Sequence, residues 1–118
     1  RVSRYVHSQT EFGNENKIYF NFMPHFLRII RPVKDWTTLD MTEQEEQIMS
    51  EHFLYLEQKF NEGKVLIAGP CEDRSMGVSI WEVESREEAE RIMYNDPAYK
   101  AGIITIEIKN YRVSLLRE

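Results

Sequence analysis

The sequence contains 118 residues, of which 42% are hydrophobic, 12% aromatic and 30% charged. A chain of this length and composition forms one globular domain with its own core, and it is too short for two such domains. The net charge of −5 argues against a nucleic-acid partner, because binding to phosphate groups needs clustered lysine and arginine side chains.

Membrane and extracellular classes of protein are also disfavoured by the sequence. No apolar run approaches the roughly 20 residues that span a bilayer, and no segment resembles a secretory signal. The single cysteine, Cys71, cannot form an internal disulfide. We therefore expect a cytoplasmic protein with no membrane partner.

The first strand is predicted at the start of the regular part of the chain. Residues 1–22 mix polar and isolated apolar residues, and we interpret them as an N-terminal arm or an upstream extension. The apolar segment 26–30 predicts a strand, which Pro32 ends because proline donates no hydrogen bond to a sheet. An extension of this strand through residues 17–22 would make a long edge ribbon suited to pairing with another subunit.

A helix is predicted over residues 42–62, after a loop in which Trp36 is interpreted as a lid over the core. Thr42 and Glu45 have the spacing of a capping box, in which each side chain satisfies a backbone N–H group of the first turn. Gly63 is the residue type that favours the left-handed backbone just past a helix end.

One side of this helix is apolar and is predicted to be buried. Its residues repeat at three- and four-residue steps: Ile48, Met49, Phe53, Leu56 and Phe60. His52 lies in this stripe, one turn from both Met49 and Leu56. A histidine on an apolar helix face is the best chemical lead in the chain.

Two further strands and a second helix follow. Residues 65–68 are continuously apolar, which predicts a central strand buried on both faces. Residues 78–84 mark a third strand after a polar turn. Residues 85–88 form a second capping box and open a helix, which the Asn-Asp-Pro segment 95–97 breaks because the residue before proline is pushed out of the helical region.

The last part of the chain contains one more short turn and the fourth strand. Asp96 can cap this turn with Pro97 in its first position. Four isoleucines over residues 103–108 predict the strand. Residues 111–116 form a tail that is a candidate for further pairing.

The order of strand, helix, strand, strand, helix, strand predicts an α+β fold over residues 23–118. This is the ferredoxin-like βαββαβ arrangement, an antiparallel sheet with both helices on one face. The open face of such a sheet must be covered, and a second copy of the same sheet would cover it. We therefore expect a homodimer through the sheet faces, with a pocket for a small-molecule ligand between sheet and helices.

Several segments resemble the YciI-like, or YCII-related, proteins. The points of match are Phe26–Pro32, Glu51–Leu56, Glu62–Pro70, Gly77–Val78, Ser85–Ala89, Asn95–Ala98 and Ala101–Ile103. The resemblance covers about residues 23–112 and implies the dimeric α+β barrel fold with a His–Asp pair, carried here by His52 and Asp96. One branch of this family eliminates chloride from a chlorinated hydroxyhydroquinone, and the wider superfamily includes muconolactone isomerases and small monooxygenases. Tyr55 and the acidic run 43–46 depart from the best-studied branch.

Histidine and aspartate together suit proton transfer. The carboxylate fixes the tautomer of the imidazole, and the other ring nitrogen moves a proton of the substrate. We predict His52 and Asp96 as catalytic residues on this ground. The alternative is a core histidine bonded to a backbone carbonyl, with Asp96 acting only as a helix cap.

Three further residues are candidates for substrate binding. Tyr55 lies one turn from His52, and Arg74 and Arg31 have side chains that hold anions. Against these roles, aromatic residues at helical spacing usually belong to the core, and arginines in loops are usually solvated. His7 and His25 lack evident partners, and no spacing of His, Asp and Glu indicates a metal site.

We predict a small enzyme without a cofactor, in which His52 and Asp96 carry out an elimination or isomerisation of a small cyclic or aromatic metabolite. A non-catalytic small-molecule-binding or dimeric scaffold module is the alternative. It would be favoured by a His52 ring beyond hydrogen-bond reach of Asp96, or by a pocket without room for a ligand. A monooxygenase of the same fold, cofactor-independent or using haem, is a third reading.

Overall fold

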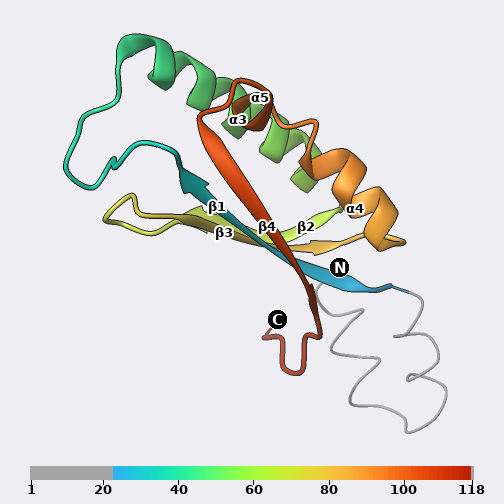
Figure 1. Cartoon of the computed structure of the whole chain (residues 1–118). Coiled ribbons are helices and arrows are strands. Elements are labelled where there is room, and N and C mark those ends of the chain that lie inside the picture. The colour runs from blue at the N-terminus through green and yellow to red at the C-terminus, as the bar shows by residue number, and fades with distance from the viewer. Residues whose placement is uncertain (1–22, 118) are drawn as a thin grey trace, which may run out of the picture.

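A computed structural model describes residues 23–117, so the predictions for residues 1–22 lie outside the described part of the chain. Within the described part, four strands and three helices follow one another. Their bounds are β1 His25–Pro32, α3 Glu43–Asn61, β2 Val65–Pro70, β3 Gly77–Glu82, α4 Arg86–Met93, α5 Pro97–Lys100 and β4 Ile104–Tyr111. Figure 1 shows the helices on one face of the sheet. The ferredoxin-like α+β fold is therefore confirmed.

Strand order places β1 inside the sheet. The order is β2-β3-β1-β4 and every neighbouring pair is antiparallel. Phe26 of β1 lies opposite Trp81 of β3 on one side and Asn110 of β4 on the other. The expectation of an edge ribbon is wrong for residues 25–32, because both hydrogen-bonding sides of this strand are already used.

β2 is an edge strand, which corrects the prediction of a central strand buried on both faces. It pairs with β3 alone among the described strands. Val65 is buried against the helices, whereas Ile67 is 66% exposed. The pairing with β3 shifts register between Val65 and Ile67, so Val65 contributes to the core while Ile67 lies on the open face of the sheet.

Helix α3 begins and ends as predicted. The Thr42 side chain accepts from the backbone N–H of Glu45, and the Glu45 carboxylate accepts from the backbone N–H of Thr42, at 3.1 and 2.9 Å. Gly63 follows the helix with φ of 83°, where a residue without Cβ is favoured.

The apolar stripe of α3 is not the buried face that its period predicted. Phe53 and Phe60 remain 59% and 53% exposed, and Met49 and Leu56 are partly buried. These side chains line a cavity instead of filling a core. Periodicity correctly found the inner side of the helix, but it could not show that this side stands over an open space.

The core lies further along the sheet, under α4. It is formed by Phe26, Val65, Trp81, Val83, Ala89, Ile92, Met93 and Ile108. Ser85 caps α4 by accepting from the N–H of Glu88. The second half of the predicted capping box is wrong, because the Glu88 carboxylate accepts from the N–H of Glu84 and not from that of Ser85.

The tail after the fourth strand does not pair again within the described chain. β4 continues to Tyr111, which lies opposite His25, and residues 112–117 form no strand. β4 extends beyond the predicted residues 103–108, because its last residues pair with the first residues of β1.

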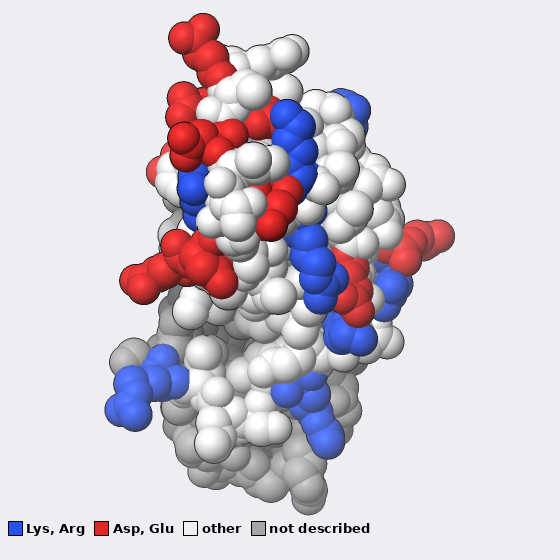
Figure 2. Space-filling model, turned by 60° about the vertical axis from the view of Figure 1, so that its left-hand side comes forward, with Lys and Arg blue, Asp and Glu red and all other residues white. Residues whose placement is uncertain are grey.

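The surface seen in Figure 2 carries both signs of charge. Acidic side chains gather in the upper part of the view, at the height of α3, with basic side chains among them. No helix within residues 23–117 combines the length and apolarity needed to cross a membrane.

Candidate functional site

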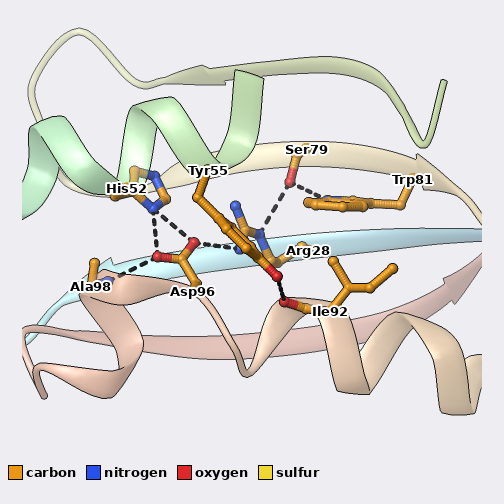
Figure 3. Close-up of polar contacts among 8 residues, drawn as sticks. All are labelled: Arg28, His52, Tyr55, Ser79, Trp81, Ile92, Asp96 and Ala98. Carbon is orange, nitrogen blue, oxygen red and sulfur yellow. Dashed lines mark hydrogen bonds and ion pairs between the residues drawn. The ribbon is translucent and has the colours of Figure 1, made fainter. Parts of the chain in front are cut away.

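His52 and Asp96 are brought together from α3 and the start of α5. The His52 Nδ1 atom lies 2.9 Å from Asp96 Oδ1 and 2.8 Å from Asp96 Oδ2. Both residues are buried, with His52 7% and Asp96 0% exposed. Figure 3 shows the imidazole of His52 directed at this carboxylate. The structure thus contains the pair that the sequence predicted, 44 positions apart in the chain.

Asp96 also caps α5, as the sequence predicted, while its carboxylate contacts His52. Its Oδ1 atom accepts from the backbone N–H of Ala98 at 2.9 Å, and Pro97 occupies the first turn of the helix. The break before Pro97 turns the chain toward α3. Capping holds the carboxylate in one orientation and leaves its other lone pairs for side chains.

Arg28 is a third member of the site that the sequence analysis missed. It lies on β1, is 2% exposed, and its Nη1 atom donates to Asp96 Oδ2 at 3.0 Å. Its guanidinium carbon lies 5.2 Å from the centre of the Trp81 ring, a distance typical of a cation–π contact. Phe26 and Arg28 are two residues apart and face the same, helix-covered side of β1. An arginine at a position where the strand pattern calls for a core residue was therefore the signal in the sequence that could have identified it.

Ser79 on β3 connects Arg28 to the core. Its Oγ atom accepts from Arg28 Nε at 3.3 Å and from Trp81 Nε1 at 2.7 Å. Ser79 and Arg28 are opposite each other in the pairing of β1 and β3. The sheet register therefore fixes the position of the guanidinium beside Asp96 (Figure 3).

Electrostatics keep this carboxylate ionised. Burial raises the pKa of Asp96, but the hydrogen bond and charge of His52, the charge of Arg28 and the N–H of Ala98 lower it by more. The net result is an Asp96 pKa below its usual value. Burial lowers the pKa of Arg28, and the neighbouring Asp96 opposes this change. An ionised carboxylate accepts hydrogen bonds only, so it orients both groups that contact it.

A cavity of about 590 Å³ opens between α3 and the sheet, and both His52 and Arg28 line it. Its walls are mainly apolar. They include Trp36, Met49, Phe53, Leu56, Phe60 and Met76. Trp36, expected as a lid over the core, is buried as a wall of this cavity. A mainly apolar space of this size with few polar groups is typical of a site for a small molecule.

The three predicted substrate-binding residues have different positions. Arg74 is exposed in the turn between β2 and β3 and lines the cavity. Tyr55 and Arg31 do not line it. The Tyr55 hydroxyl donates to the carbonyl of Ile92 at 2.8 Å, and Arg31 pairs with Glu107 at 2.9 Å on the exposed surface.

His25 has a partner, contrary to the sequence interpretation. Its Nε2 atom lies 3.2 Å from a carboxylate oxygen of Glu82, and both side chains are buried. This pair is separate from the lining of the cavity. Within residues 23–117, no group of three or more His, Cys, Asp or Glu side chains is placed to hold a metal ion.

A profile of the YCII-related domain matches residues 24–112, which is most of the described chain. The chain belongs to the YCII-related domain family. The resemblance seen in the sequence is therefore confirmed. None of the curated proteins compared with the chain matches it.

One solved structure similar to this YCII-related domain is a 5-chloro-2-hydroxyhydroquinone dehydrochlorinase from Burkholderia phenoliruptrix, in complex with 2,5-dihydroxybenzoquinone. The TM-score is 0.50 and the sequence identity 22%, over 74% of this chain and 93% of the other. At this identity the likeness supports the shared fold.

Neither condition that would favour a non-catalytic module is met. The His52 ring is in hydrogen-bond contact with Asp96, and the cavity has room for a ligand. In chemical terms, the site offers one imidazole held by a buried carboxylate at the wall of an apolar space.

Proposed function

We propose that this YCII-related domain is a small enzyme that needs no cofactor and transfers a proton through His52. The reaction class is the elimination or isomerisation of a small cyclic or aromatic metabolite. The observation that carries the proposal is the 2.8 Å contact between His52 Nδ1 and Asp96 at the wall of the cavity.

The chemistry follows from the orientation of the imidazole. Asp96 holds the Nδ1 side of the ring, so the Nε2 atom is the one that receives a proton from the substrate. The electron pair left on the substrate then expels a leaving group or shifts a double bond. Asp96 stabilises the imidazolium that forms until the proton is returned.

Two further observations support this reaction class. The apolar walls suit the ring of a cyclic compound. The solved neighbour is a dehydrochlorinase bound to a quinone, and removal of hydrogen chloride is an elimination. Arg74, at the cavity, is proposed to hold an anionic part of the substrate.

The proposal includes a cytoplasmic homodimer that pairs through the open faces of the sheets. The exposed Ile67 on that face supports the pairing. The free and exposed Cys71 supports a reducing compartment.

The test is a screen of lactones and halogenated phenols as substrates, followed by His52→Ala. We expect this substitution to lower turnover by about 10²- to 10⁴-fold, the usual contribution of general acid–base catalysis. The matched control is Tyr55→Phe, one helical turn away, which removes a hydroxyl that contacts Ile92 and not the cavity. It should keep full turnover.

Full activity in the His52→Ala protein, with an unchanged circular dichroism spectrum, would refute the proposed mechanism. Tight binding of ring compounds by the wild-type protein without any turnover would favour the small-molecule-binding module instead.

A further inference from the structure

Arg28 presents hydrogen-bond donors to the cavity that nothing in the described chain uses. Its Nε and Nη1 atoms donate to Ser79 and Asp96. No hydrogen bond within residues 23–117 engages its Nη2 atom, although the residue is 2% exposed and lines the cavity. Because this nitrogen has no partner in the described chain, it is free to donate a charge-assisted hydrogen bond to an acceptor on a ligand in the cavity.

Ser79 offers a second unused donor beside Arg28. Its oxygen already accepts from Arg28 and Trp81, which occupies both acceptor positions of a hydroxyl. Its own hydrogen has no acceptor in the described part of the chain. Ser79 is 2% exposed and also lines the cavity. The Arg28 Nη2 atom and the Ser79 hydroxyl, on adjacent strands, are therefore both available to donate to an oxygen atom of a ligand.

His52 provides the complementary acceptor. The Asp96 carboxylate can only accept, so in the neutral form of the imidazole the hydrogen lies on Nδ1 and Nε2 carries the lone pair that can take a proton. His52 Nδ1 and Arg28 Nη1 both contact the same oxygen, Asp96 Oδ2, at 2.8 and 3.0 Å. The imidazole and the guanidinium therefore lie on either side of the same carboxylate, as Figure 3 shows.

We propose that Arg28 and Ser79 bind the oxygen of a small ring compound with an acidic hydroxyl group, phenolic or enolic, and hold it as an oxyanion. The inference rests on the proposed function, because His52 receives the proton. The O–H bond of the ligand breaks, an N–H bond forms at His52 Nε2, and the electron pair stays on the oxygen. Arg28 donates hydrogen bonds throughout and keeps its own protons.

The probe for this site is 4-nitrophenol, whose absorption spectrum distinguishes the phenol from the phenolate. In buffer where the free probe is mostly protonated, binding to the wild-type protein should produce the phenolate band. Arg28→Met should weaken this binding by about 10- to 100-fold, since a hydrogen bond to a charged group is lost. Ser79→Ala should weaken it by less.

The matched control is Arg31→Met on the same strand. Arg31 pairs with Glu107 outside the cavity, so its loss should leave binding unchanged. The neutral analogue 4-nitrotoluene should bind equally to the wild-type and Arg28→Met proteins, which shows that the cavity is intact.

Arg28→Lys tests the role of Arg28 in phenolate binding if the Arg28→Met protein does not fold. Lysine keeps the charge beside Asp96 but lacks the planar set of donors, so phenolate binding should fall while 4-nitrotoluene binding is retained. The inference is overturned if the wild-type protein binds the neutral phenol, or if it binds 4-nitrophenol no better than 4-nitrotoluene. It is also overturned if the folded Arg28 variants bind the phenolate as tightly as the wild type.

His52→Asn separates this inference from the proposed function. A His52→Asn protein that still binds the phenolate fully, while the Arg28 variants do not, would contradict His52 as proton acceptor and leave Arg28 as the anion-binding residue. Unchanged binding in the Arg28 variants, with loss of turnover in His52→Ala, would refute only the role of Arg28.

Discussion

Asp96 is the residue on which the other polar groups of the site depend. One buried carboxylate accepts from the backbone of α5, from the imidazole of His52 and from the guanidinium of Arg28. The charge of Arg28 offsets part of the cost of burying the carboxylate. A buried carboxylate with these partners links the acid stability of the fold to the geometry of the site.

Asp96→Asn is expected to remove part of the acid dependence of folding. The pKa of Asp96 is lowered in the folded protein, so its stabilising effect is present above the unfolded value near 3.8 and is lost as the pH falls through the lower folded value. The difference in free energy of unfolding between the wild-type and Asp96→Asn proteins should therefore be large at neutral pH and shrink below about pH 4. Urea unfolding across this pH range measures it.

Asp73→Asn is the control for this prediction. Its pKa is also lowered, chiefly by the hydroxyl and backbone N–H of Ser75, but the side chain is exposed, so solvent screens its contribution. A pH profile for Asp96→Asn that parallels the wild type would contradict the coupling.

At the scale of elements, the ends of α3 are defined by local contacts and its inner face by its surroundings. The capping box at Thr42 and the positive φ at Gly63 involve residues within a few positions of the helix ends. The exposure of Phe53 and Phe60 instead results from the cavity beneath them. One helix thus combines a locally determined start with a face that only tertiary packing explains.

Thr42→Ala is expected to lower the free energy of unfolding by about 0.5–2 kcal/mol, because one N–H of the first turn loses its acceptor. Gln44→Ala in the same turn is the control, and its effect should stay within about 0.5 kcal/mol. Equal effects of the two substitutions in urea unfolding would show that the cap adds nothing.

At the scale of the whole molecule, the two faces of the sheet are used differently. The face that carries Arg28 and Ser79 meets the helices and the cavity. Alternation along the strands places Leu27 and Ile80 on the other face, and the exposed Ile67 lies opposite Ile80 on the edge strand. An apolar open face of this kind is suited to contact with a second copy.

Ile67→Lys should therefore convert the proposed homodimer to a monomer, because each copy would bring an unpaired charge into the contact. Leu54→Lys is the matched control, since Leu54 is similarly exposed but lies on α3, away from the open face. Sedimentation equilibrium measures both masses. A dimer that survives Ile67→Lys, or a wild-type monomer, would contradict pairing through the sheet faces.

The amino-acid sequence by itself determined the order of elements, the ends of α3, the cap at Asp96 and membership of the family. These features depend on residues close together in the chain or on a pattern of short motifs. The pairing of His52 with Asp96 was predictable from the same resemblance.

Only the tertiary structure decided the strand order, the cavity and the place of Arg28. Arg28 and Asp96 are 68 positions apart, and their contact depends on β1 lying inside the sheet and on α5 packing against α3 and β4. Apolar residues occupy both faces of β1 and β2, so period alone could not distinguish an interior strand from an edge strand. The physical reason is that sheet order and open space arise from long-range packing, which no local propensity encodes.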